Sequence, residues 1–142
     1  MSRKSAIILL AGGQARRMGG GDKNLIELAG KPVLRHVLDR VDCANRPIML
    51  NANGDPARYA DFGLPVCADV IDGYAGPLAG ILTGLGWVAA NQPDCTHIVS
   101  LATDAPFLPV DLIARLEAGL DGGADIAQAV SYTRRHPVFA IW

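Results

Sequence analysis

The chain of 142 residues has little charge and no long apolar run, and each shortage excludes a class of protein. Charged residues make up 19% and the net charge is −1, so no basic surplus exists for wrapping a nucleic acid or coating an anionic membrane. The apolar run 6–11 is far shorter than the ~20 residues of a membrane span. The low charge and the short apolar run lead us to expect no nucleic-acid or membrane partner. Because hydrophobic residues make up 50%, we expect one globular domain.

Cysteine is also scarce. The three cysteines, Cys43, Cys67 and Cys95, lie far apart and form no C-x-x-C pair. Their odd number fits a reducing compartment, and they lack the ligand spacing of a zinc site. The basic start at 1–5 is followed by a glycine- and arginine-rich stretch rather than by a typical signal peptide. We therefore expect a cytoplasmic protein.

Short apolar runs alternate with helical patterns along the chain. We expect strands over 6–10, 47–51, 64–68, 97–102, 125–130 and 137–142. Helices are expected to begin at Pro32, Ala57, Gly76-Pro77 and Pro109. This order predicts an α/β fold, a Rossmann-like three-layer αβα sandwich whose sheet is mostly parallel, with an antiparallel strand near the C-terminus. In the third helix we expect an apolar stripe facing the core, made of Leu78, Ile81, Leu82, Leu85, Val88 and Ala89.

A glycine-rich segment follows the first strand. Between Ala11 and Asp22 lie five glycines and two arginines, and Lys23 comes next. Clustered glycines let backbone N–H groups face an anion, and the cations suit a triphosphate. Neither the P-loop pattern nor G-x-G-x-x-G is present after this strand, which argues against a P-loop NTPase or a dinucleotide-binding dehydrogenase. The alternative is a solvated surface loop.

Polar residues also follow the other strands. Asn51 and Asn53 come after the second, Asp69 after the third and Asp104 after the fourth. Ligands bind such sheets beyond the carboxyl ends of the strands, so we expect these residues at the triphosphate site. Asp104 is placed to hold Mg²⁺, which takes carboxylate and phosphate oxygens. Asp69 or Asn51 could accept the N–H donors of guanine. Taken singly, each of these residue types is more often a turn or helix-cap residue.

For two further residues, Gly80 and His136, the sequence allows either a structural or a functional role. Gly80 lies in the small-residue run at the start of the third helix, where it allows close approach of either a substrate or the sheet. His136 precedes Pro137, where it either caps the turn between strands or reaches an acceptor substrate.

These motifs resemble the signature of sugar-nucleotide and cofactor nucleotidyltransferases, and more closely that of molybdenum cofactor guanylyltransferases. The Gly12-Gly13 pair resembles the guanylyl branch rather than the cytidylyl branch. The resemblance spans the whole chain, in Leu10-Ala11-Gly12-Gly13, Arg17-Met18-Gly19-Gly20, Asp22-Lys23, Gly30-Lys31-Pro32, Asn51-Ala52-Asn53, Asp69, Gly76-Pro77-Leu78-Ala79-Gly80, Thr103-Asp104-Ala105-Pro106 and His136-Pro137.

The resemblance implies transfer of GMP from GTP to the terminal phosphate of molybdopterin or Mo-molybdopterin, with release of pyrophosphate and with Mg²⁺ as cofactor. It assigns Asp104 to the metal, and Gly80 and His136 are kept as candidates for the acceptor. The attacking phosphate is already ionised at pH 7, so Arg17, Lys23 and Asp104 act as catalytic residues by positioning and charge. The implied nucleotide-binding residues are Leu10, Ala11, Gly12, Gly13, Lys23, Asn51, Asp69 and Asp104.

Three alternatives stay open: a molybdopterin cytidylyltransferase, a sugar-1-phosphate nucleotidyltransferase and a non-catalytic GTP-binding module. The resemblance also implies a monomer that makes transient contact with proteins delivering or receiving the cofactor. Family members continue past the point that matches Trp142. We therefore expect 1–142 to be a single nucleotidyltransferase domain that lacks its C-terminal portion.

Overall fold

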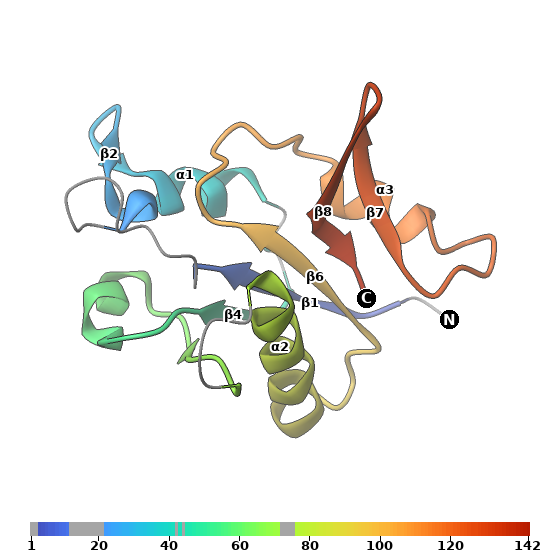
Figure 1. The fold of residues 1–142 in the computed structure, drawn as a ribbon, viewed down its shortest axis with the longest axis horizontal. Helices are drawn as coiled ribbons and strands as arrows, with labels where there is room; N and C mark the ends of the chain where they lie inside the picture. Colours follow the sequence, from blue (N-terminus) through green and yellow to red (C-terminus); the bar gives the residue numbers. More distant parts are fainter. Residues whose placement is uncertain (1–2, 12–21, 42, 44, 72–75) are drawn as a thin grey trace.

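A computed structural model describes residues 3–11, 22–41, 43, 45–71 and 76–142 (Figure 1). The helices are α1 (Val33–Arg40), α2 (Pro77–Asn91) and α3 (Leu112–Ala118), with 3-10 helices η1 (Lys23–Leu25) and η2 (Pro56–Phe62). The strands are β1 (Ser5–Leu10), β2 (Glu27–Leu28), β3 (Lys31–Pro32), β4 (Ile48–Asn51), β5 (Val66–Cys67), β6 (His97–Ala102), β7 (Ala127–Ser131) and β8 (Arg134–Ile141).

Six strands form one sheet in the order β5-β4-β1-β6-β8-β7. The first four run parallel, whereas β8 is antiparallel to both β6 and β7. This confirms the expected α/β fold with a mostly parallel sheet. The hairpin turn is tighter than expected, since only Tyr132 and Thr133 separate the last two strands. The small β2-β3 hairpin was not predicted from the sequence, because each of its strands has only two residues.

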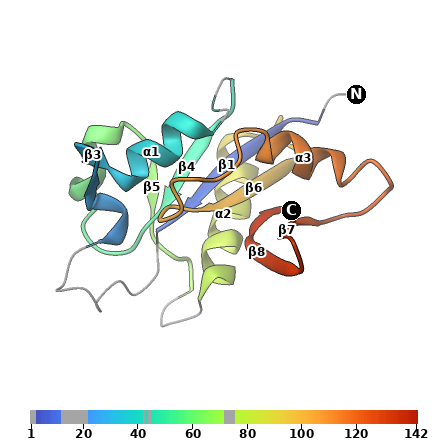
Figure 2. The same cartoon turned by 90° about the horizontal axis from the view of Figure 1, so that it is seen from above.

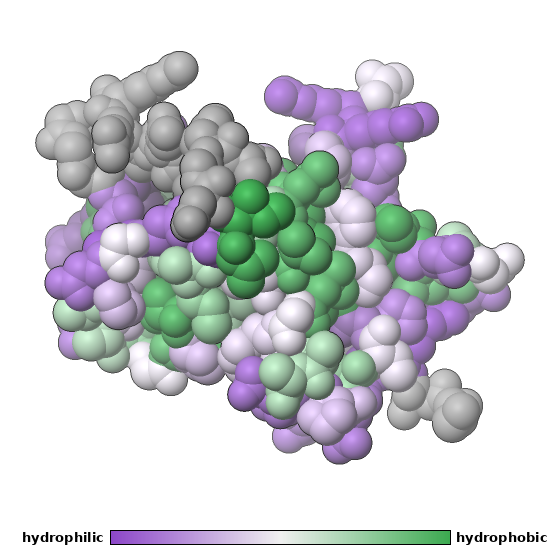
Figure 3. Space-filling model, turned by 60° about the horizontal axis from the view of Figure 1, so that its bottom comes forward, coloured by the Kyte–Doolittle hydropathy of each residue, from purple (hydrophilic) through white to green (hydrophobic). Residues whose placement is uncertain are grey.

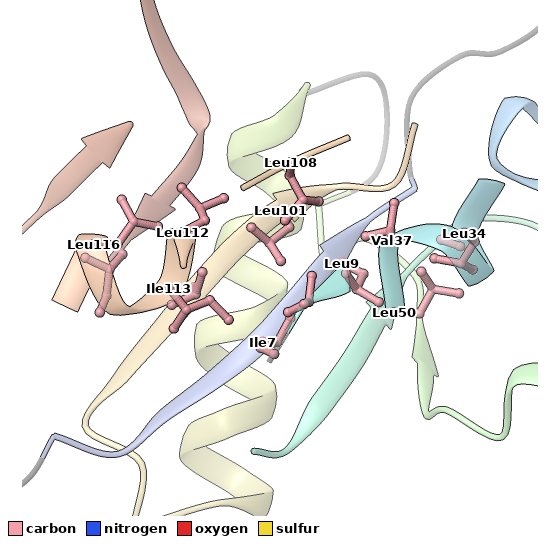
Figure 4. Packing of buried hydrophobic residues seen from close by; sticks show 14 of the residues in the cluster. Ile7, Leu9, Leu34, Val37, Leu50, Leu101, Leu108, Leu112, Ile113 and Leu116 are labelled. Carbon is pink, nitrogen blue, oxygen red and sulfur yellow. The ribbon is translucent and has the colours of Figure 1, made fainter. Parts of the chain in front are cut away.

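Apolar side chains of β1 alternate between two cores. Ile7 and Leu9 pack on the face covered by α1 and α3, whereas Ala6 and Ile8 pack on the face covered by α2. Figure 2 shows these helices on opposite sides of the sheet, and Figure 4 shows Leu101 among the side chains of the first core. The three expected layers are therefore present, and both central strands, β1 and β6, are buried between them.

Helix α2 packs on the sheet through small residues, which corrects the expected apolar stripe. Ile81 and Val88 are buried as expected, but Leu78, Leu82 and Leu85 are exposed. Figure 3 shows apolar surface in the middle of this side of the molecule. A Cβ at Gly84 would lie 2.7 Å from Cγ1 of Ile8, so the glycine face allows a close approach that leucines would block. Because α2 has no charged residue, hydropathy alone did not mark its buried face.

Two further expectations changed in detail. The helix expected from Pro109 begins at Leu112, whose N–H donates to the carbonyl of Pro109 in the preceding turn. The helix expected near Ala57 is the 3-10 helix η2, which begins at Pro56 after an Asp55 cap. In the described part of the chain, no helix has the length and apolar character needed to cross a membrane.

Candidate functional site

The four parallel strands end along one edge of the sheet, and this edge gathers several of the predicted residues. Leu10 pairs with Asn51 on one side and with Ala102 on the other. The N–H of Ala11 donates to the carbonyl of Asn51 at 2.8 Å. Strand pairing therefore brings Leu10, Ala11 and Asn51 side by side, at the carboxyl ends of the parallel strands, where ligands bind such sheets.

Asn51 and Asp69 form a hydrogen-bonded cluster with Asn53. The amide of Asn51 is buried and donates to the carbonyl of Cys67 at 3.2 Å and to Oδ1 of Asp69 at 2.9 Å. The side-chain amide of Asn53 donates to Oδ2 of Asp69 at 3.0 Å, and its Oδ1 accepts from the backbone N–H of Asp69 at 2.8 Å. Each carboxylate oxygen thus accepts one N–H and keeps a lone pair for another donor.

Gly80 is buried in the first turn of α2, directly against this cluster. A Cβ at this position would lie 2.4 Å from Oδ1 of Asn51 and 2.7 Å from Cδ2 of Leu10. The absence of a side chain thus lets the helix approach the sheet where Leu10 and Asn51 meet. A contact between Gly80 and an acceptor substrate stays a prediction.

Lys23 and Asp104 lie on two segments that meet at the same edge. Lys23 begins η1 and Asp104 follows β6, and both side chains are exposed. Among the described residues, neither side chain forms a hydrogen bond or ion pair. The segments are joined by their neighbours, because Asn24 donates to the hydroxyl of Thr103 at 3.1 Å. Both charges are therefore available to a ligand.

The donor set around Asp104 fits a magnesium ion held largely by substrate. In the described ranges, no group of three or more His, Cys, Asp or Glu side chains could hold a metal. Mg²⁺ is commonly held by one or two carboxylates together with waters and substrate phosphates. The carboxylate of Asp104, which has no partner in the described part of the chain, suits that mode, so a cation here would depend on a bound phosphate.

Sequence reasoning missed Arg58, although it fixes the start of the Lys23 segment. Its Nε donates to Asp22 at 2.7 Å, and its guanidinium also donates to the carbonyls of Asn53 and Asp55. The guanidinium carbon lies 4.7 Å from the centre of the Tyr59 ring. No motif marks an arginine in a short 3-10 helix as part of a site, so only the fold reveals it.

Tyr59 and Asn24 were also missed. Both are buried, and the Tyr59 hydroxyl donates to Oδ1 of Asn24 at 3.1 Å. Burial raises the pKa of Tyr59, and its hydrogen bond to Asn24 opposes the rise. A polar residue directly after Lys23 was the one signal available in the sequence.

The remaining predicted residues are Gly12, Gly13, Arg17 and His136. Gly12, Gly13 and Arg17 fall outside the described residues. His136 lies near the start of β8, where its Nε2 is 2.6 Å from the hydroxyl of Ser131 and its ring meets Phe139 edge-on. Because Ala140 pairs with Ser100 in antiparallel register, this part of β8 extends past the carboxyl end of β6 (Figure 1). A role toward an acceptor substrate stays a prediction.

Comparison with known proteins identifies relatives over most of the chain. A model of the MobA-like NTP transferase domain matches residues 7–142. Molybdenum cofactor guanylyltransferase of Rhodopseudomonas palustris (strain BisB5) is 57% identical over 136 residues, which are 95% of this chain and 65% of that protein. The enzyme of the same name from Mesorhizobium japonicum is 54% identical over 100% of this chain and 68% of its own length. The chain thus spans about two thirds of these relatives.

Solved structures share the fold. Molybdopterin-guanine dinucleotide biosynthesis protein A of Archaeoglobus fulgidus gives a TM-score of 0.69 at 20% identity, over 96% of this chain and 66% of that one. A homolog of Rv0371c from Mycobacterium sp. strain JC1 gives 0.74 at 26% identity, over 96% and 68%. Rv0371c of Mycobacterium tuberculosis in complex with manganese gives 0.67 at 20% identity, over 98% and 70%.

Proposed function

Because the chain belongs to the MobA-like NTP transferase family, we propose that it transfers GMP from GTP to the terminal phosphate of molybdopterin or Mo-molybdopterin. The names of its relatives at 57% and 54% identity support this reaction. The observation that carries the proposal is the carboxyl edge of the sheet. There the side chains of Lys23 and Asp104, which form no hydrogen bond or ion pair within the described residues, lie at the same edge as the hydrogen-bonded cluster of Asn51 and Asp69.

The reaction needs charge neutralisation more than proton transfer. An oxygen of the molybdopterin phosphate bonds to the α-phosphorus of GTP, and the bond from that phosphorus to the leaving pyrophosphate breaks. The second pKa of a phosphate monoester is near 6, so the attacking group is largely ionised at neutral pH and needs no general base. The difficulty is bringing two anions together, which cationic groups relieve.

Lys23 and Asp104 divide this work. The exposed ammonium of Lys23 binds triphosphate oxygens, and Arg17 is proposed to assist it. Asp104 would hold a divalent cation, which supplies further positive charge at the α-phosphate and the leaving group. We propose Mg²⁺, and the manganese complex of Rv0371c supports a divalent ion in this fold.

The nucleoside is proposed to bind on the other side of the site. Leu10 and Ala11 end the central strand, and Gly12 and Gly13 follow them. The free lone pairs of Asp69 can accept the two N–H donors on the pairing edge of guanine. Asn51 donates its amide hydrogens to the Cys67 carbonyl and to the Asp69 carboxylate, so its role is to orient the carboxylate of Asp69. Gly80 and His136 stay candidates for the acceptor side.

The proposal extends to the domain organisation and the oligomeric state of the protein. We propose that 1–142 acts as one nucleotidyltransferase domain and binds GTP as a monomer. Transient contact with proteins that deliver or receive the cofactor, and a cytoplasmic location, stay predictions. Neither is needed for the binding experiment below.

Isothermal titration with GTP, CTP and ATP, with and without Mg²⁺, tests the proposal. GTP should bind most tightly, and pyrophosphate should appear only after molybdopterin is added. Lys23→Ala should weaken GTP binding by about 1.5–3 kcal/mol, the usual contribution of a charged hydrogen bond. Asp104→Asn should remove the effect of Mg²⁺. Lys4→Ala, an exposed lysine before β1 at the opposite edge, is the matched control.

The outcomes separate the alternatives. Preference for CTP would reassign the base, and turnover of a sugar 1-phosphate would reassign the acceptor. GTP binding without turnover in the presence of molybdopterin would favour a non-catalytic module. Equal GTP affinity in the Lys23→Ala variant would remove Lys23 from the site.

A further inference from the structure

Three buried polar side chains form a chain of hydrogen bonds beneath the site. Tyr59 donates to Oδ1 of Asn24, Nδ2 of Asn24 donates to the hydroxyl of Thr103, and that hydroxyl donates to the carbonyl of Leu10. Each of the three bonds is 3.1 Å long. Asn24, Thr103 and Tyr59 come from segments that follow β1, β6 and β4, respectively, so the chain ties together three separate parts of the carboxyl edge.

The direction of this chain is fixed at its inner end. The Leu10 carbonyl can only accept, so the single hydrogen of the Thr103 hydroxyl is committed to it. The oxygen of Thr103 is then left to accept from the amide of Asn24, whose own oxygen faces Tyr59. Reversing the Asn24 amide would place two acceptors opposite each other. Because a buried polar group without a partner is costly, one arrangement is strongly favoured.

Two members of this chain, Asn24 and Thr103, are adjacent in sequence to the two proposed catalytic residues. Asn24 follows Lys23, and Thr103 precedes Asp104. Within the described residues, Lys23 and Asp104 make no bonds of their own, so their side chains do not set the distance between them. The bond between their buried neighbours spans 79 positions of sequence and holds the two segments together.

We infer that Asn24 and Thr103 are positioning residues that set the separation of Lys23 and Asp104 for one triphosphate. The inference rests on the proposed function, because it requires both charges to act on the same ligand. Without the hydrogen bond the two segments can drift apart, and the ammonium and a cation on Asp104 no longer meet the same phosphates at once. The consequence is a loss of cation-dependent affinity rather than a general loss of binding.

The test compares Thr103→Val, which removes the hydroxyl and nearly keeps the shape, with Thr103→Ser, which keeps the hydroxyl. GTP affinity is measured by titration with and without Mn²⁺. Thr103→Val should lower the affinity with Mn²⁺ by about tenfold and leave the affinity without it within about twofold, a coupling within the usual range for neighbouring groups. Thr103→Ser should retain most of the Mn²⁺ effect. Ser100→Ala removes another buried hydroxyl, on the preceding strand β6, and should leave both affinities unchanged.

A purely structural role is separated by combining variants. In an Asp104→Asn background, Thr103→Val should cause no further loss of Mn²⁺-dependent affinity, because the group being positioned is already gone. An equal loss in both backgrounds, or a Thr103→Val variant that behaves like Thr103→Ser, overturns the positioning role. If Thr103→Val does not fold, Asn24→Ala carries the same test, because it removes the donor to the Thr103 hydroxyl. Failure of the unmodified chain to bind GTP overturns the proposed function, and this inference with it.

Discussion

Gly80 and Asn51 lie so close that a Cβ on Gly80 would be 2.4 Å from Oδ1 of Asn51. The amide of Asn51 cannot easily move away, because it donates to both Cys67 and Asp69. The first turn of α2 and the end of β4 are therefore fitted to each other at the site. A substitution at either residue should change both the affinity for GTP and the stability of the fold.

Gly80→Ala should lower both stability and GTP affinity. The added methyl group has to displace Asn51 or lift α2 from the sheet, and such overpacking typically costs about 1–3 kcal/mol. Urea unfolding and GTP titration measure the two losses. The matched control is Gly86→Ala in the same helix, where a Cβ would meet nothing within 4 Å. There the helix should gain about 0.5–1 kcal/mol, because alanine is the better helix former. Equal stability of the two variants would contradict the packing.

Glu117→Gln should destabilise the protein by about 1–2 kcal/mol. Its carboxylate accepts from Arg46 at 2.7 Å and from Ser5 at 2.9 Å in a half-buried group near the start of β1. The glutamine is neutral, so the charge of Arg46 is left without its partner. Because the pair is only half-buried, the loss of stability should be smaller than for a fully buried ion pair. The midpoint of chemical unfolding measures the effect.

The exposed pair of Lys31 and Asp39 supplies the contrast to Glu117. Lys31 holds the pKa of Asp39 below its usual range, yet the pair is open to solvent. Asp39→Asn should therefore leave the unfolding midpoint at neutral pH unchanged within error. A larger loss for Asp39→Asn than for Glu117→Gln would contradict this ranking.

Tyr59 should ionise above the ordinary tyrosine pKa of ~10 when the native protein is titrated with base. Burial raises its pKa, so the folded state favours the neutral phenol. The resulting stability is fully present below the ordinary tyrosine pKa of ~10 and is lost as the pH rises through the native value. The measurement is tyrosinate absorbance during base titration, compared between the native protein and the Tyr59→Phe variant. The prediction fails if the ionisation step that is missing in Tyr59→Phe lies at or below the ordinary tyrosine pKa of ~10.

Leu82 and Ile81 are neighbours in α2 with opposite expected responses. Ile81→Ala should cost about 2–4 kcal/mol, because Ile81 is buried against the sheet. Leu82→Gln should change the free energy of unfolding by less than about 0.5 kcal/mol, since Leu82 is exposed. Similar losses for both would restore the stripe expected from the sequence.

Much of the fold could be predicted because the strongest signals are local. The apolar runs of β1 and β6 and the helical spacing of α1 reflect burial that each segment shows by itself. The buried face of α2 could not be found in this way, since glycines at positions 80 and 84 mark it rather than leucines. In the site, motifs pointed to Lys23, Asn51, Asp69 and Asp104. Motifs did not point to Asn24, Tyr59 and Arg58. These residues hold the segments of the site in place through contacts between distant parts of the chain, which no local pattern shows.

The place of β1 in the sheet has a consequence for how the chain folds. Its neighbour β4 is made soon afterwards, but β6, on its other side, is made much later, and Leu10 and Thr103 are 93 positions apart. At ordinary rates of synthesis, roughly 5–20 s pass before that partner exists. The β7-β8 hairpin, by contrast, can form within microseconds of its completion. Strand β1 therefore gains its second partner only after β6 has been made, and we expect the central pairing of the sheet to form late.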